Sequence, residues 1–239
     1  MSVKSSSNSD SDLFPQEGIE RLGGRSNRNN IIRATVIIRG ERALLWHHFG
    51  ENVLSLEKRE KEGVAGNDPS EWKRTVLLTK KGQLYLEPES IFSCMRDAAK
   101  YTRRAKYSIQ GAVAATLQVD DASVLVNRFL PKTKLTTDRS RPVYLDIRSV
   151  RNPNTRNRNI RYRIGASRGW RATFHLIWDK TIVSRNEMKA VAIDAGRLIG
   201  LGDGRAIGNG RFEIKSFAVA DYAKARPRPL VRKKVGRRR

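Results

Sequence analysis

The sequence of 239 residues has few of the features that define several large protein classes. Cys94 is the single cysteine, which excludes an internal disulfide and a zinc site built from several cysteines. No apolar run approaches the roughly 20 residues of a membrane-spanning helix, and the start MSVKSSSNSDSD lacks the apolar segment of a secretion signal. We therefore expect a cytoplasmic protein with no cofactor, no metal and no membrane partner.

Acidic residues are scarce relative to basic ones. The chain has 48 Lys+Arg against 24 Asp+Glu, a net charge of +24 and a pI near 10.9. Between Ile147 and Trp178 there is no acidic residue at all, and the arginines that stand in this Arg-rich segment are Arg148, Arg151, Arg156, Arg158, Arg161, Arg163, Arg168 and Arg171. Like charges at this density repel one another unless an anion binds, so a nucleic-acid partner is expected. A solvated hairpin is the alternative interpretation.

The periodicity of apolar residues predicts six main elements. They are strands at 31–39, 143–150, 170–178 and 211–219, and helices at 88–104 and 184–199. In the strand at 170–178, alternation places Trp170, Ala172, Phe174, Leu176 and Trp178 on one face. The order βαββαβ indicates an α+β fold of the ferredoxin-like (RRM-like) type with insertions.

The second helix runs into a glycine-rich loop. Ser184 followed by Glu187 predicts a capping box at the start of this helix, and Gly200 predicts its end. From Gly200 to Gly210, five glycines alternate with polar residues that include Arg205, and Arg211 follows. Such a loop can bring backbone amides close to phosphate, although a long turn between helix and strand explains the same glycines.

The composition also predicts how the chain is divided. Residues 1–30 are predicted to be a flexible N-terminal segment and residues 31–222 an RRM-like domain with insertions near 44–86 and 105–140. Residues 105–140 fit either strands or a packed insertion. Residues 223–239 carry nine basic residues and no acidic one between Lys224 and Arg239, which predicts a disordered basic tail.

Two stretches give a resemblance to a known family. QLYLEPESIFSCMRDAAK resembles the entry to the first helix in the repeat-associated (RAMP) superfamily of CRISPR proteins, and IGLGDGRAIGNGRFEI resembles the glycine-rich loop of that superfamily. The chain is most similar to the backbone subunits that coat guide RNA, and a phage or mobile-element relative fits equally well. The resemblance implies single-stranded RNA held by phosphate contacts, with copies of the protein side by side.

The resemblance and the charge pattern together select the candidate RNA-binding residues. By matching position, the glycine loop contributes Gly204, Arg205, Gly208, Gly210 and Arg211, and the first helix contributes Arg96. The basic face of the helix at 88–104 adds Lys100, Arg103 and Arg104, and the Arg-rich segment adds Arg151, Arg156, Arg158, Arg161, Arg163 and Arg168.

Catalysis is weighed on the three histidines. His47 and His48 follow the first strand and His175 lies in a later one, but no second catalytic group stands at an informative spacing from any of them. Asp68 is a candidate only through its loop setting. We therefore expect an RNA-binding backbone subunit that oligomerises along a guide RNA with other subunits of a ribonucleoprotein. An endoribonuclease on the same fold and a basic phage packaging or structural protein stay open, as does single-stranded DNA in place of RNA.

Overall fold

The computed structural model describes residues 30–48, 68–151 and 158–222. Its main sheet is antiparallel with the strand order β11-β1-β10-β7-β3, and the short strand β6 also pairs with β10. The strands of this sheet are β1 (Ile31–Gly40), β3 (Gln83–Leu86), β6 (Gln118–Val119), β7 (Val124–Phe129), β10 (Arg171–Asp179) and β11 (Phe212–Asp221).

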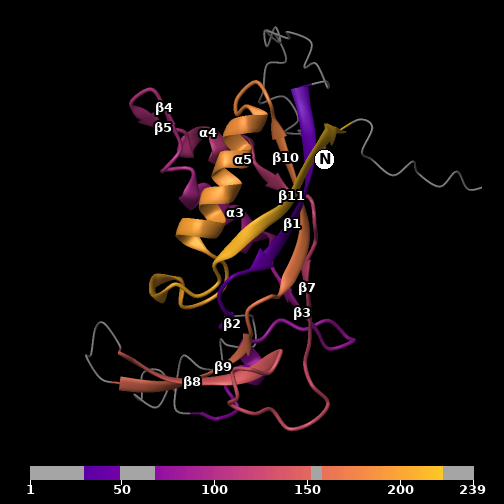
Figure 1. Cartoon of the computed structure of the whole chain (residues 1–239), viewed down its shortest axis with the longest axis vertical. Coiled ribbons are helices and arrows are strands. Elements are labelled where there is room, and N and C mark those ends of the chain that lie inside the picture. The colour runs from indigo at the N-terminus through magenta and orange to yellow at the C-terminus, as the bar shows by residue number, and fades with distance from the viewer. Residues whose placement is uncertain (1–29, 49–67, 152–157, 223–239) are drawn as a thin grey trace, which may run out of the picture.

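Two long helices pack against this sheet. The helices α3 (Pro88–Ala98) and α5 (Arg185–Asp194) lie together on one side of it in Figure 1. The first core strand is β1, the second is the β6–β7 pair, the third is β10 and the fourth is β11, so the spatial order is fourth, first, third, second. This is the ferredoxin-like order, and the predicted α+β class is confirmed.

The core forms where strand alternation meets the helices. In β1, Ile32, Ala34, Val36 and Ile38 are fully buried, and the residues between them face the other side of the sheet. The apolar face predicted for β10 and for Trp170 just before it is also confirmed, since each of its members is at most 4% exposed. That face comprises Trp170, Ala172, Phe174, Leu176 and Trp178.

The start of α5 agrees with its sequence signal. The Ser184 hydroxyl accepts a hydrogen bond from the Glu187 amide, and the Glu187 carboxylate accepts one from the Ser184 amide. The helix continues as a π-helical turn, η3 (Ala195–Ile199), and ends at Gly200 with a φ of 83°. Cys94 of α3 packs against this turn, and burial raises its pKa to about 12, so the thiol is protonated at neutral pH.

The first helix is shorter than predicted. It ends at Ala98, and the chain then turns into a small hairpin of β4 (Arg103–Arg104) and β5 (Tyr107–Ser108). Ala105 occupies the turn with a φ of 53°. Lys100, Arg103 and Arg104 therefore lie beyond the end of the helix and not on its basic face, because the chain leaves the helix after Ala98 and Arg103 and Arg104 pair with β5.

The strand predicted at 143–150 exists but belongs to another sheet. It is β8 (Val143–Arg151), which pairs with β9 (Arg158–Ala166), and β9 pairs with β2 (Leu44–Trp46). One face of β8 carries the charged residues Asp146 and Arg148, while Val143 and Leu145 on the other face pack against the core from this second sheet. The second core strand comes instead from residues 105–140, which also hold α4 (Gln110–Thr116); in β7, Val124 and Val126 are fully buried.

The β8–β9 hairpin lies at one end of the molecule. In Figure 1 it runs across the direction of the main strands, at the lower end of the view. Short helix α2 (Trp72–Thr75) lies near β9, and an antiparallel bridge between Leu78 and Leu84 closes a short hairpin before α3.

Several predictions concern other parts of the chain. The flexible N-terminal segment, the basic tail and Arg156 lie outside the described residues, as do residues 49–67 of the first predicted insertion. The domain boundaries stay a prediction. Among the described helices, none is both long and apolar enough to cross a bilayer.

Candidate nucleic-acid interface

The glycine-rich loop is a folded unit that closes on itself and on the start of β2. The Leu201 amide donates to the Gly210 carbonyl, and the Gly210 amide donates to Ala43. The Asp203 amide donates to Leu45. The glycines of the loop share a positive φ between 70° and 84°, and they are Gly200, Gly202, Gly204, Gly208 and Gly210.

Two of these glycines have opposite surroundings. A Cβ atom on Gly210 would lie 1.8 Å from the Leu201 carbonyl oxygen, whereas a Cβ on Gly208 would meet no atom within 4 Å. Gly210 is therefore required for the loop to close, which supports the interpretation of a packed turn at this point. Gly208 lies beside the exposed turn Arg205–Ile207, where a ligand can approach the backbone.

A cavity of about 610 Å³ lies between this loop and the helices. It brings together residues that the sequence had placed on separate elements: Lys100 after α3, Gly204 and Arg205 in the loop, and Arg211 before β11. The Lys100 ammonium lies 4.9 Å from the ring centroid of Tyr101, a side chain that is 49% exposed. A cation beside an accessible aromatic ring suits a nucleotide, because the ring can stack on a base.

The acidic residues of this cavity are already neutralised by other arginines. Asp97 binds Arg96 at 2.8 Å, and Asp203 binds Arg163 at 2.5 Å. Neither arginine lines the cavity. Within the described residues, Lys100, Arg205 and Arg211 have no carboxylate partner, and Nη1 of Arg211 is buried without a hydrogen bond. The cavity therefore has a surplus of positive charge.

A smaller cavity of about 320 Å³ adjoins the first on the other side of Arg205. It is lined by the first turns of α3, through Ser90 and Ser93, and by His47 and His48 after β2. Helix amides in a first turn favour an anion, but the Glu89 carboxylate of this turn lines the same cavity and already supplies negative charge there. Sequence reasoning missed both serines, although their place after Pro88 at the start of a helix is a readable signal.

Several arginines of the Arg-rich segment are paired with carboxylates that lie outside the segment. Arg163 is 5% exposed and bonds Asp146 at 3.0 Å as well as Asp203. Arg161 bonds Glu71 at 2.7 Å. These two arginines therefore have counterions although the segment itself contains no Asp or Glu. The inference that they need a bound anion is wrong for Arg161 and Arg163.

Glu71 is a second centre of charge in this region. Its carboxylate accepts hydrogen bonds from Arg161 and the Tyr162 amide, and it lies 3.1 Å from Nε2 of His47. Burial disfavours the charged form, but the hydrogen bonds from His47, Tyr162 and Arg161 outweigh it and lower the pKa of Glu71 to about 2. The ionised carboxylate therefore joins α2 to β9.

Replacing Glu71 by glutamine should flatten the acid side of the stability curve. A carboxylate whose pKa is lowered by folding stabilises the protein above its unfolded pKa, and this contribution disappears as pH falls from about 4.5 to about 2. The shift corresponds to about 3 kcal/mol. Urea unfolding between pH 7 and pH 2 measures the difference, and Glu89→Gln, the same change at an exposed glutamate, is the control. Parallel curves for the Glu71→Gln variant and the parent protein would contradict this role.

The remaining candidates are spread over the surface. Arg104 makes a bidentate contact with Glu187 of the capping box, with both hydrogen bonds at 3.0 Å, and Arg168 bonds Glu41 at 2.5 Å. Arg103 is exposed on β4. Arg151 and Arg158 are exposed opposite each other on β8 and β9, a like-charged pair that would gain from an anion.

The three histidines do not form one site. His48 lies 3.2 Å from Glu87 and lines the smaller cavity with His47. His175 is on the other face of the main sheet from the helices, where Asp121 accepts hydrogen bonds from its amide and lies 2.9 Å from its ring. Asp68 binds Ser70 and Arg74 around the start of α2. The described residues contain no group of three or more His, Cys, Asp or Glu that could hold a metal.

Comparisons with known proteins give one kind of match. No family model matches the sequence, and no curated protein does. A solved structure described as the Type III-B Cmr-beta bound to cognate target RNA contains a chain that resembles this one, with a TM-score of 0.40 and 12% sequence identity. The match covers 80% of this chain and 61% of that chain.

Proposed function

We propose that this protein binds single-stranded RNA through the glycine-loop cavity and that copies of it lie side by side along the strand. The observation that carries the proposal is the set of three cations, Lys100, Arg205 and Arg211, which line one cavity without a carboxylate partner among the described residues. Phosphate oxygens are the natural counterions of such a set, and the net charge of +24 favours a polyanion.

The form of the cavity favours a single strand over a duplex. Its lining is a loop backbone with positive φ values and an accessible tyrosine ring, which suits an unstacked nucleotide with its phosphate. No side chain of this set lies on an exposed helix that could enter a major groove. Binding should therefore depend on phosphates and tolerate many sequences.

The assembly part of the proposal comes from the resemblance to CRISPR backbone subunits. There, side-by-side copies on guide RNA are what the two sequence motifs imply. In this chain the glycine loop, which carries one motif, borders both cavities, and the start of α3, which carries the other, borders the smaller one. A strand that passes Arg205 would contact both.

Light scattering on RNAs of increasing length tests binding and assembly together. The mass of the complex should grow with RNA length for the parent protein, and the variant Lys100→Ala/Arg205→Ala/Arg211→Ala should form shorter assemblies or none. Loss of three phosphate contacts should also reduce the slope of log affinity against log salt by about 2. Because the three side chains are on the surface or lack carboxylate partners, the melting temperature should change little.

A variant with the same change of charge is the control. Lys80, Lys81 and Lys132 are exposed near the β3 edge of the sheet, whereas the glycine loop leads into β11 at the opposite edge. Replacing these three lysines by alanine should leave the mass on RNA unchanged. Equal losses of mass on RNA in the two triple variants would show that the interaction depends only on net charge. A mass that stays at one or two copies on every RNA would refute the assembly.

An endoribonuclease is the second candidate function. The observation in its favour is His48, which lines the smaller cavity next to Arg205 and Ser90. RNA that shortens during the light-scattering experiment with the parent protein, and stays intact with His48→Asn, would favour it over a binding subunit.

A further inference from the structure

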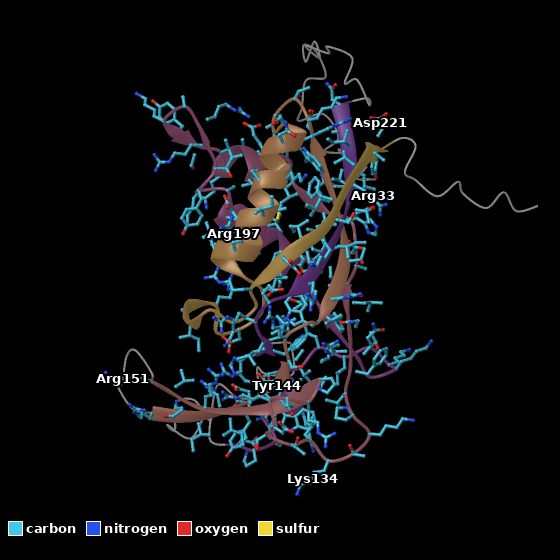
Figure 2. The ribbon with its side chains drawn as sticks, viewed as in Figure 1. Arg33, Lys134, Tyr144, Arg151, Arg197 and Asp221 are labelled. Carbon is cyan, nitrogen blue, oxygen red and sulfur yellow. The ribbon has the colours of Figure 1, made fainter. Side chains whose placement is uncertain are left out.

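A third cavity, of about 640 Å³, shares no lining residue with the two described above. It lies where the turn between β1 and β2 meets the base of the β8–β9 hairpin. Figure 2 shows Tyr144 at this junction, where the hairpin joins the lower end of the main sheet. The side chains that define the cavity are those of Glu41, Arg42, Arg139, Tyr144, Arg148 and Arg168.

Tyr144 is buried and has an unused hydroxyl. Its side chain packs on Gly165 across the hairpin, where a Cβ atom would lie 2.6 Å from Cζ of the ring, and the residue is 1% exposed. Within the described residues its hydroxyl makes no hydrogen bond, although it borders the cavity. Burial and the nearby Asp146 carboxylate raise the pKa of Tyr144, so the hydroxyl stays protonated and can donate. The hydroxyl oxygen is not among the buried polar atoms that lack a partner, so it is accessible from the cavity and can donate to a ligand there.

The arginines around Tyr144 outnumber the carboxylates. Arg139 and Arg148 both bond Oδ1 of Asp146, at 3.4 and 2.9 Å, and the other oxygen of Asp146 is taken by Arg163. Arg168 bonds Glu41. Arg42 is exposed and has no carboxylate partner among the described residues. Four arginines therefore line the cavity, and of the two carboxylates beside it, Asp146 is also bound to a fifth arginine, Arg163.

We propose that this cavity binds a phosphate group, with the Tyr144 hydroxyl and Arg42 as its principal donors. Guanidinium groups and a hydroxyl donor match the oxygens of a phosphate, and the surplus of cations offsets its charge. A volume of about 640 Å³ is large enough for a whole nucleotide. The site does not rest on the RNA-binding function proposed above, because it uses other residues and takes either a terminal phosphate or a phosphodiester.

Isothermal titration calorimetry at low salt tests the site with three probes. These are ATP, a 5′-phosphorylated oligonucleotide and the same oligonucleotide with a 5′-hydroxyl. Tyr144→Phe keeps the ring on Gly165 and removes one hydrogen bond to a charged group, so it should weaken the matching probe about tenfold at an unchanged melting temperature. Arg42→Gln, at an exposed position, should weaken the same probe by a similar factor.

The pattern across probes identifies the source of the phosphate. If the variants lose affinity only for ATP and the 5′-phosphorylated strand, the site binds a terminal phosphate. If they also lose affinity for the 5′-hydroxyl strand, the site binds a phosphodiester. Arg33→Gln is the matched control, since Arg33 pairs with Asp120 on the far face of the main sheet. Affinities that are the same for Tyr144→Phe, Arg42→Gln and the parent protein would overturn the proposal. ATP binding that is lost only in the Lys100/Arg205/Arg211 variant would do the same, and it would leave the RNA-binding proposal standing.

Discussion

Replacing Gly210 by alanine is expected to destabilise the protein by about 2–5 kcal/mol. Two costs add up, namely about 1–2 kcal/mol for a left-handed backbone with a Cβ atom and about 1–3 kcal/mol for overpacking. The overpacking is severe here because the new Cβ would lie 1.8 Å from a backbone oxygen, that of Leu201, which cannot rotate away. Unfolding by urea, followed by fluorescence of the four tryptophans, measures the loss.

Gly208→Ala provides the control for this prediction. Gly208 has a φ of 84°, similar to the 71° of Gly210, but a Cβ atom there meets nothing within 4 Å. The cost should therefore be the backbone term alone, about 1–2 kcal/mol. RNA affinity provides a second difference between the two variants. Gly210→Ala should lose RNA affinity because the loop loses its shape. Gly208→Ala should lose RNA affinity only if RNA approaches this exposed turn. Equal destabilisation by the two variants would refute the closure of the loop through Gly210.

Replacing Arg163 by methionine is expected to cost about 3–5 kcal/mol, because it leaves buried carboxylate charge without its main partner. The Asp146 side chain is fully buried and receives Arg163 on one oxygen, while Arg148 and Arg139 remain on the other. Asp203 of the glycine loop would lose its partner at the same time. Thermal and urea unfolding both report the change.

A double-mutant cycle separates the charge effect from lost packing. Adding Asp146→Asn to Arg163→Met removes the carboxylate charge that Arg163 had paired, so the loss of stability in the double variant should be smaller than the sum of the two single losses. Arg168→Met is the exposed control: its pair with Glu41 joins an arginine that is 68% exposed, and such surface pairs contribute about 1 kcal/mol or less. A loss for Arg163→Met no larger than for Arg168→Met would contradict the role of the buried pair.

The same residue connects the β8–β9 hairpin to the loop of the proposed interface. Arg163 belongs to β9, and Asp203 belongs to the glycine loop that borders the cavity with Lys100. The ion pair therefore fixes the loop against the base of the β8–β9 hairpin. If Arg163→Met remains folded, it should also weaken RNA binding, since the loop would lose one of its anchors.

The sequence by itself determined the local elements and the class of fold. Alternation in β1 and β10 and the Ser184–Glu187 capping box are encoded within a few residues, so periodicity and short spacings predicted them. The strand that joins the main sheet as its second core strand was not predicted from the sequence. Both 143–150 and 124–129 form strands. Val124 and Val126 enter the main core, whereas Asp146 and Arg148 of β8 form ion pairs. Which of the two strands joins the main sheet depends on contacts between distant segments.

The candidate site divides in the same way. The sequence identified the glycine loop and its arginines, but the convergence of Lys100 with Arg205 and Arg211 depends on how α3 packs beside the loop. Which arginines stay available was decided by the tertiary structure, because their carboxylate partners are 90 positions away for Arg161 and 40 for the bond from Arg163 to Asp203. The roles of Gly208 and Gly210 likewise separate only once the chain has folded, since a steric contact with Leu201 distinguishes two glycines that look the same in sequence.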